Sequence, residues 1–232
     1  FMAPALDAKD KKIVGNMDEE ALHSVVRDYI LEHPEIIVEA LENYQVRRQE
    51  IEQANFGKKL KDNMSALHEG PYVGNPKGDI VVVEFFDYNC GYCKKAVPDV
   101  QQIIENDKNV KIVFKDLPIL SSSSNEAARW ALAAEKQGKY WDYHLALMNF
   151  RGTKNAESLA QIAKETGLDV DQMRKDINSK EVTAALEESR RLSQELGING
   201  TPAFIIGDTL APGYMGYDNM KAAIEAVRDE QG

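Results

Sequence analysis

The chain of 232 residues has only two cysteines, Cys90 and Cys93, and two residues separate them. This count excludes a four-cysteine zinc module and a scaffold held by several disulfides. The fold must therefore rest on a hydrophobic core, which 43% hydrophobic residues and this length can supply. The β-branched and aromatic run Ile80–Phe86 precedes the cysteines and a helical pattern follows them, so the pair is predicted at a strand-to-helix junction.

This location gives the two cysteines a chemical role. Free N–H groups and the helix dipole at a helix N-terminus favour a thiolate over a thiol. We expect Cys90 to be the exposed nucleophile and Cys93, one turn later, to resolve the mixed disulfide. Gly91 gives the loop freedom, and Tyr92 offers a flat contact surface beside the thiols.

Two other interpretations of the cysteine pair are weaker. A zinc site needs two further ligands, and the four histidines show no paired spacing. A purely structural disulfide would close a loop too short to constrain the unfolded chain appreciably.

The pattern around the cysteines predicts an α/β fold. The strand Ile80–Phe86, a helix and the strand Val110–Phe114 make a βαβ unit, which requires a parallel strand pair. A helical insertion over about 121–196 follows, beginning with the serine run Ser121–Ser124 as a loop and helix cap. The expected insertion helices are Asn125–Gln137, Tyr140–Phe150, Ala156–Thr166, Val170–Asn178 and Val182–Leu196.

The chain closes with a strand, a turn and a helix. Pro202–Ile206 is the predicted strand, Thr209 and Leu210 follow a turn, and Tyr217–Arg228 is the final helix. Thr201 precedes Pro202, and a bond of this type leading into a strand can be cis.

Together, the cysteine pair, the Thr201-Pro202 step and this element order resemble the thioredoxin superfamily, and within it the DsbA-like branch, over residues 79–232. The resemblance implies that Thr201 and Pro202 form a cis-proline loop facing Cys90. It also implies a proton-transfer role for Glu84, a carboxylate inside the strand six residues before Cys90, because burial raises a carboxyl pKa.

Within this branch, Gly91-Tyr92 and Thr201 resemble periplasmic disulfide isomerases more than the oxidases, which typically have Pro-His between the cysteines. The layout is most similar to the suppressor-of-copper-sensitivity C family, and Com1-type DsbA-like proteins are the alternative. The resemblance implies disulfide isomerisation on misfolded periplasmic proteins, with dithiol oxidation as an alternative. A cytosolic thioredoxin-like reductase is a third possibility, which the long insertion disfavours.

No cofactor is expected beyond the redox-active disulfide of Cys90 and Cys93. A second class of function uses the same thiols to hold Cu(I), a soft ion that thiolates favour, in copper tolerance.

The N-terminal part has its own organisation. Residues 1–16 read as a flexible tail, 17–44 as a helical oligomerisation segment and 45–78 as a helical, charged linker. In residues 17–44, apolar residues recur every three or four positions on both sides of a break at Pro34. This stripe has no partner inside the segment, so it either docks on the following domain or packs against copies of itself. The polar stretch Gln45–Gln53 is typical of a solvated connecting helix, which favours self-association. We therefore expect a homo-oligomer, a trimer by resemblance and a dimer as the alternative.

Charge and hydropathy exclude further classes. With 28 Lys+Arg against 38 Asp+Glu, the net charge of −10 disfavours a nucleic-acid partner. No stretch approaches the ~20 apolar residues of a membrane helix. Because the chain begins at Phe1, we expect a mature protein whose export signal was removed. The resemblance to the DsbA-like branch implies that it works in the periplasm with a membrane redox partner.

Overall fold

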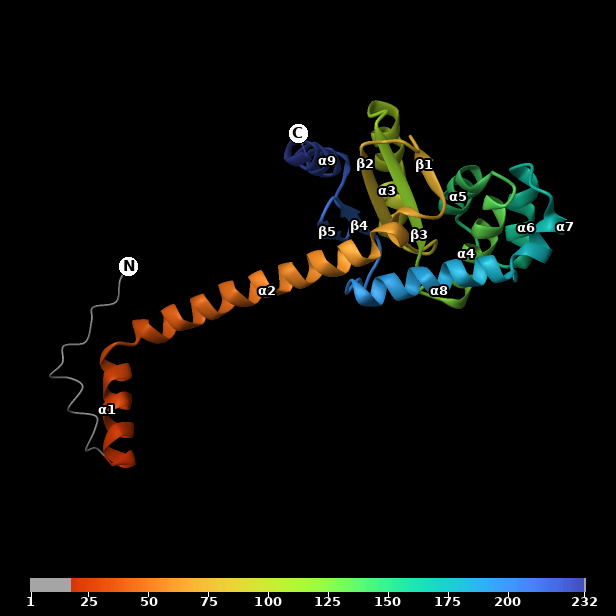
Figure 1. Ribbon diagram of the computed structural model, residues 1–232. Helices are drawn as coiled ribbons and strands as arrows, with labels where there is room; N and C mark the ends of the chain where they lie inside the picture. The colour runs from red at the N-terminus through yellow and green to blue at the C-terminus, as the bar shows by residue number, and fades with distance from the viewer. Residues whose placement is uncertain (1–17, 232) are drawn as a thin grey trace. The chain divides into compact units, whose positions relative to one another are not determined.

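The computed structural model describes residues 18–231, which divide into two compact units between Asn55 and Phe56. Figure 1 shows the helices and strands of the chain. The helices are α1 (Glu19–Glu32), α2 (Glu35–His68), α3 (Gly91–Asn106), α4 (Ser122–Glu135), α5 (Tyr140–Asn149), α6 (Ala156–Glu165), α7 (Val170–Asp176), α8 (Lys180–Glu195) and α9 (Tyr217–Gln231). The strands are β1 (Tyr72–Gly74), β2 (Ile80–Phe86), β3 (Val110–Asp116), β4 (Ala203–Ile206) and β5 (Thr209–Pro212).

The first unit consists of α1 and the first part of α2. Asp18 caps α1 by accepting a hydrogen bond from the Ala21 backbone N–H at 2.8 Å. The helix ends before His33, as the proline at position 34 predicts. The expected flexible tail, residues 1–16, lies outside the described residues.

The predicted apolar stripe of this unit is exposed, and no residue of α1 is buried. We use the name "apolar stripe" for its large members, which are Leu22, Val25, Val26, Tyr29, Ile36, Ile37, Leu41 and Tyr44, between 37% and 58% exposed. Large apolar side chains exposed in such numbers usually mark an interaction site.

Helix α2 is one continuous helix, although the stretch Gln45–Gln53 has almost no apolar residues. This stretch is exposed throughout, whereas Leu60 and Leu67 near the end of the helix are buried in the second unit. The expected linker 45–78 is therefore divided at Asn55, and its later part belongs to the core of the second unit.

The second unit contains a five-stranded sheet in the order β1-β3-β2-β4-β5. Strands β2 and β3 are parallel, with Ile80 opposite Val110, as the βαβ pattern predicts. The other neighbours are antiparallel. Strand β1 pairs with β3 and was not predicted from the sequence.

The residues of β2 alternate between two hydrophobic layers. Ile80, Val82 and Phe86 pack in the larger cluster, which includes residues of α3, α9 and the insertion helices. Val83 and Phe85 face the other way and share a smaller cluster with Leu60 of α2, and with α8. The sheet thus lies between two layers of helices, and Glu84 belongs by alternation to the α3 side.

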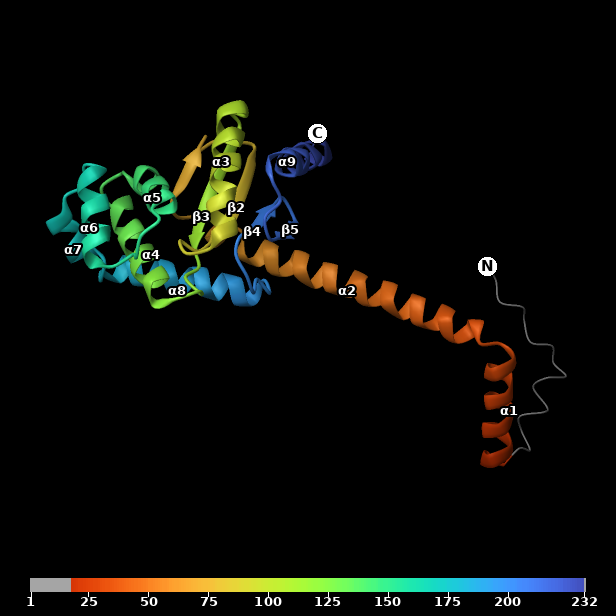
Figure 2. The ribbon, with the colours of Figure 1, turned by 180° about the vertical axis from the view of Figure 1, so that it is seen from behind.

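The insertion is entirely helical, from α4 to α8, close to the predicted 121–196. Both ribbon views show α4 to α7 gathered on one side of the sheet (Figures 1 and 2). The observed architecture confirms the thioredoxin fold with a helical insertion.

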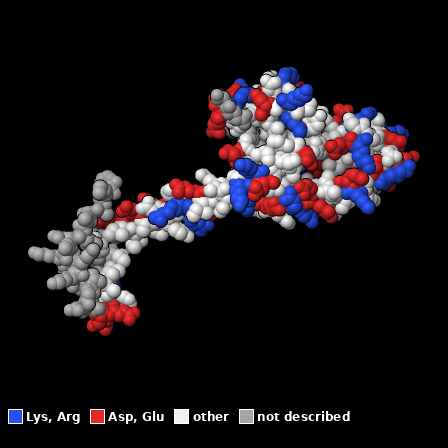
Figure 3. Space-filling model, viewed as in Figure 1, with Lys and Arg blue, Asp and Glu red and all other residues white. Residues whose placement is uncertain are grey.

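The charges of the second unit are mixed. On the face shown in Figure 3, basic and acidic side chains are interspersed over this unit. Among the described residues, no helix is long and apolar enough to cross a membrane.

Candidate active site at Cys90 and Cys93

Cys90 lies at the junction of β2 and α3, as predicted. It is the N-cap residue of α3, and its Sγ accepts a hydrogen bond from the Cys93 backbone N–H at 3.4 Å. The same helix places Cys93 one turn later, where its side chain is completely buried. Both cysteines are free, so the structure represents the dithiol form.

The Thr201–Pro202 loop lies against Cys90. The peptide bond between Thr201 and Pro202 is cis, and the Cys90 thiol donates to the Thr201 carbonyl oxygen at 3.2 Å. The Pro202 carbonyl in turn accepts from the Gly213 N–H at 2.8 Å, which fixes the loop to the residue after β5. The prediction that Cys90 is exposed is wrong: its exposed fraction is 7%, because the thiol is hydrogen-bonded to this loop.

Glu84 is buried on β2, on the same side of the sheet as α3. Burial raises the pKa of its carboxyl from 4.5 to about 8. Burial also raises the pKa of the Cys93 thiol, and the charge of Glu84 contributes to that rise. The carboxyl and the second thiol are therefore close enough to influence each other.

The two residues between the cysteines face solvent. A Cβ atom added at Gly91 would meet no atom within 4 Å, so the backbone there does not require glycine. Tyr92 is 65% exposed and stacks on Tyr214, with ring centroids 6.5 Å apart. The Lys95 ammonium lies 4.3 Å from the Tyr214 ring centre. These rings form the flat surface that the sequence predicts at Tyr92.

The side chain of Asn89, the residue before Cys90, is held by hydrogen bonds to the insertion. These contacts were not predicted from the sequence. Its Nδ2 donates to the hydroxyls of Ser121, Ser123 and Ser124 at 2.8–2.9 Å. The predicted role of the serine run as a helix cap is confirmed, because Ser121 is the N-cap of α4. The same run therefore also positions the loop that carries Cys90.

Lys154 reaches the other side of Asn89 from the loop between α5 and α6. Its Nζ donates to Asn89 Oδ1 at 3.2 Å, and the side chain is only 3% exposed. Burial and the positive charge of Lys94 lower its pKa to about 8. No sequence signal marks Lys154, because its loop has no regular pattern to align it with the cysteines.

Asp87 ties the β3–α4 loop to the same segment. Its Oδ2 accepts from the Ile119 and Leu120 N–H groups at 2.9 and 3.0 Å, and its Oδ1 accepts from Asn89 N–H at 2.7 Å. The carboxylate is buried, and these three backbone donors satisfy it.

A buried polar network lies beneath the active-site segment. Tyr88 Oη lies 3.1 Å from His144 Nδ1, and Tyr140 Oη donates to Asp116 Oδ2 at 3.2 Å. Burial lowers the pKa of His144 to about 3 and raises that of Asp116. His144 is thus a neutral core histidine that stacks on aromatic rings, including Trp141.

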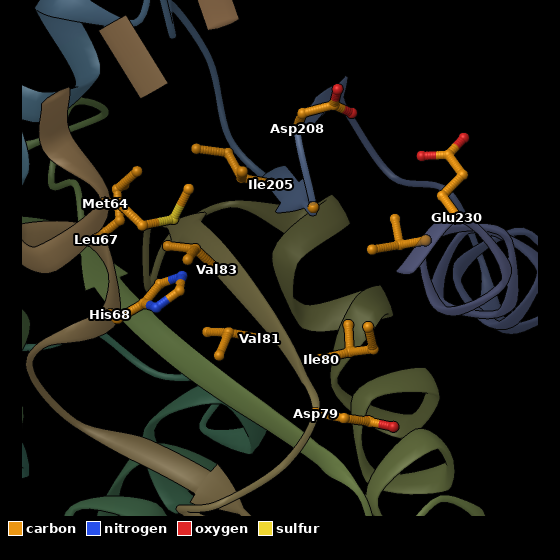
Figure 4. A pocket seen from close by; sticks show the side chains of 12 residues that line it. Met64, Leu67, His68, Asp79, Ile80, Val81, Val83, Ile205, Asp208 and Glu230 are labelled. Atoms are coloured by element: carbon orange, nitrogen blue, oxygen red, sulfur yellow. The ribbon is translucent and has the colours of Figure 1, made fainter. Parts of the chain in front are cut away.

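The described residues contain no cluster of three or more His, Cys, Asp or Glu side chains suited to a metal ion. A cavity of about 430 Å³ lies elsewhere in the second unit (Figure 4), between the end of α2, the start of β2 and α9. His68 and Asp208 are among its lining residues, but none of the predicted site residues is. The chemistry therefore belongs to the β2–α3 junction.

Two family models match the chain. The DSBA-like thioredoxin domain matches residues 81–225, and the copper resistance protein ScsC N-terminal domain matches residues 18–50. The first match includes every predicted site residue from Glu84 to Pro202. The second contains the whole apolar stripe of the first unit.

Some solved structures resemble only the catalytic part of the chain, and others resemble nearly all of it. A thioredoxin-like oxidoreductase from Silicibacter pomeroyi is 44% identical, with a TM-score of 0.69, and the match covers 71% of this chain and 96% of that one. Proteus mirabilis ScsC in a transitional conformation is 29% identical, with a TM-score of 0.68, over 97% of this chain and 98% of that one.

Curated relatives match the catalytic part. Disulfide bond formation protein D of Bacillus subtilis is 26% identical over 170 residues, which are 67% of this chain and 75% of that protein. The chain spans only 24% of the length of other curated relatives, two Na⁺/H⁺ antiporters of Salinispora arenicola and Salinispora tropica.

Proposed function

The chain belongs to the DSBA-like thioredoxin domain family, a family of thiol–disulfide oxidoreductases, and we propose that it isomerises disulfides in periplasmic proteins. The observation that carries the proposal is the position of the Cys90 sulfur. It lies at the N-terminus of α3 and 3.2 Å from the Thr201 carbonyl, next to a backbone where an extended substrate can pair.

In the first step the Cys90 thiolate attacks one sulfur of a substrate disulfide. A new S–S bond joins Cys90 to the substrate while the substrate's own S–S bond breaks, and the electron pair leaves on the second substrate sulfur as a thiolate. The N–H groups at the start of α3, one of which is the Cys93 N–H, stabilise the negative charge on Cys90. The freed substrate thiolate can then attack a different substrate disulfide or return to Cys90.

In the second step Cys93 releases a substrate that remains bound to Cys90. The Cys93 thiol passes its proton to the ionised fraction of Glu84, which is about a tenth at pH 7 for a pKa near 8. The resulting thiolate attacks the Cys90 sulfur, so that a Cys90–Cys93 disulfide forms and the substrate leaves as a thiolate. Because Cys93 is buried, a neighbouring proton acceptor is needed for this step.

Isomerisation, rather than simple oxidation, is supported by two features. The residues next to the thiols, Gly91, Tyr92 and Thr201, resemble those of periplasmic isomerases. The apolar stripe of the first unit is suited to self-association, which would place several Cys90 thiols in one particle around a misfolded substrate. The match to the ScsC N-terminal domain supports the same arrangement.

The test is refolding of scrambled ribonuclease by the full chain and by residues 56–232. The shorter chain begins at the boundary of the second unit, and it retains the buried Leu60 and Leu67. We expect isomerase activity from the full chain, with an oligomeric mass, and at least tenfold less from the shorter chain. Equal activity of the two would contradict the role of the first unit, and no activity of either would contradict isomerisation.

A second candidate function is Cu(I) handling, and the match to a copper resistance domain model favours it. Thiolates are soft ligands that suit Cu(I), and Cys90 and Cys93 would hold the ion as cargo between them. Competition with a Cu(I) chelator tests this candidate. Cys90→Ser and Cys93→Ser should each abolish binding, and binding that survives both changes would place the ion elsewhere.

A further inference from the structure

The side chain of Lys154 is unusual because it is a buried cation without an ion pair. It is only 3% exposed, and none of the ion pairs within residues 18–231 includes it. Its hydrogen bond to Asn89 Oδ1 holds the ammonium in one place at 3.2 Å. Burying a charge without an opposite partner is costly, so a position of this kind usually serves a ligand or a reaction.

A second cation makes the position less favourable still. Lys94, on the first turn of α3, is close enough to lower the pKa of Lys154. The carboxylate of Asp87 acts in the opposite direction, but its influence is the smallest of those that shift the pKa of Lys154. Two like charges are therefore held together with only a weak offset from a carboxylate.

Both lysines lie next to the segment that carries the thiols. Lys94 follows Cys93, and its backbone N–H donates to the Cys90 carbonyl at 3.1 Å. Lys154 is bonded to the side chain of the residue before Cys90. Lys154 Nζ is thus fixed one residue from Cys90, and Lys94 belongs to the first turn of the helix that Cys90 caps.

We propose that Lys94 and Lys154 form a subsite for a carboxylate next to the disulfide that Cys90 attacks. This inference rests on the proposed thiol–disulfide exchange and names the substrate feature that the same site prefers. An acidic side chain in a polypeptide and the carboxylate of a small disulfide share this chemistry. Either would supply the negative charge that the buried lysine lacks, through charge-assisted hydrogen bonds.

The test uses the full chain and three disulfide-bonded peptides that differ only in the residue beside the cysteine, which is Glu, Gln or Lys. We expect kcat/KM for the Glu peptide to exceed that for the Lys peptide about tenfold, the ratio that one charge-assisted bond supplies. Lys154→Met keeps the aliphatic stem and should reduce this ratio to within about twofold of unity. Lys94→Met, at a less buried position, should reduce it in the same direction even if Lys154→Met folds poorly.

The matched control is Lys95→Met. Lys95 lies one residue further along α3, over the Tyr214 ring, and is not near Lys154 in the contacts described. This change removes the same formal charge and should leave the Glu-to-Lys ratio unchanged.

Three results separate this inference from its rivals. If none of the three peptides undergoes exchange, the Gln peptide included, the result contradicts the proposed function itself. Exchange with all three peptides at one rate would overturn the subsite alone. If Lys154→Met slows all peptides equally and shifts the pH dependence of Cys90 alkylation, the lysines act on the thiolate and not on a substrate carboxylate, which also overturns the subsite.

Small disulfides identify the source of the carboxylate. Oxidised glutathione carries carboxylates, whereas hydroxyethyl disulfide carries none. A loss in Lys154→Met that is seen with the Glu peptide and with oxidised glutathione assigns the subsite to any carboxylate-bearing disulfide. A loss confined to the Glu peptide assigns it to polypeptides, and no loss with either overturns it.

Discussion

At the scale of single residues, Glu84 links the chemistry of the site to the stability of the fold. Its pKa is about 8 in the folded chain, whereas the ordinary value is 4.5. Between these two values the folded state holds one more proton than the unfolded state. The free energy of unfolding therefore falls as the pH rises from about 4.5 to about 8, by a few kcal/mol from this residue.

Glu84→Gln should remove this dependence, since an amide cannot ionise. We expect the variant to gain stability over the native chain by at least ~1 kcal/mol at pH 8.5, with a smaller difference at pH 5. Urea unfolding at the two pH values measures this. A native chain whose stability changes no more than that of the variant between pH 5 and pH 8.5 would show that Glu84 is not a buried neutral acid.

The same substitution should act on one chemical step only. Glu84→Gln is expected to slow release of substrate by Cys93 at least tenfold, because the buried thiol loses its proton acceptor. Alkylation of Cys90 by iodoacetamide should keep its rate, which provides the control in the same protein. Unchanged release in single-turnover experiments would assign the proton of Cys93 to another group.

Site residues that belong to a local sequence pattern could be predicted from the sequence. Site residues that come together only in the folded chain could not. Cys90 and Cys93 are defined by their spacing and their strand-to-helix context, and Pro202 by its place before a strand. Asn89 and Lys154 meet only because the insertion folds back onto the active-site loop, 65 residues apart along the chain. Local patterns contain no information about such a contact.

At the scale of secondary structure elements, α2 has two different parts. Its later residues Leu60 and Leu67 belong to the core of the second unit, although they are in the same helix as the exposed stretch Gln45–Gln53. A helix can therefore continue through a segment that has no apolar face, because its intrinsic propensity and its packed end suffice.

Leu60→Ala should destabilise the second unit by about 2–5 kcal/mol, since the side chain is 2% exposed and leaves a cavity. Ile51→Ala is the matched control on the same helix, at 61% exposure, and should change stability by no more than ~0.5 kcal/mol. Fluorescence of Trp130 and Trp141, the only tryptophans, reports on this unit alone. Equal losses of stability in the two variants would show that the end of α2 is not part of the core.

The elements that the sequence predicted are those with a long apolar pattern. Strands β2 and β3 and the helices of the insertion show it clearly. Strand β1 has three residues, ends in a glycine and follows a Gly-Pro step, so its sequence predicts a loop. In the folded chain it is a strand because it pairs with β3. Its formation depends on a neighbour and not on its own residues.

At the scale of the whole molecule, the chain combines the unit that carries the cysteines with a unit whose large apolar side chains face solvent. Charged substitutions in the apolar stripe should prevent self-association without reaching the active site. The double change Val26→Glu and Leu41→Glu is expected to reduce the mass in solution to that of one chain of 26.0 kDa. Exchange with a small disulfide, counted per Cys90, should be unchanged.

Arg47→Glu is the control for added charge, because Arg47 is an exposed polar residue of α2 outside the stripe. It should leave the mass as it is in the native chain. A native chain of 26.0 kDa in light scattering would contradict the oligomer.

Cys90 attacks the substrate and Cys93 releases it in the proposed mechanism, and trapping of the covalent intermediate distinguishes these two roles. Mass spectrometry of the chain after incubation with a disulfide-containing substrate protein gives the answer. Cys93→Ser should accumulate a mixed disulfide through Cys90, because the resolving thiol is absent, and Cys90→Ser should accumulate none. A mixed disulfide formed through Cys93 in the Cys90→Ser variant, or none in either variant, would contradict this assignment of the two cysteines.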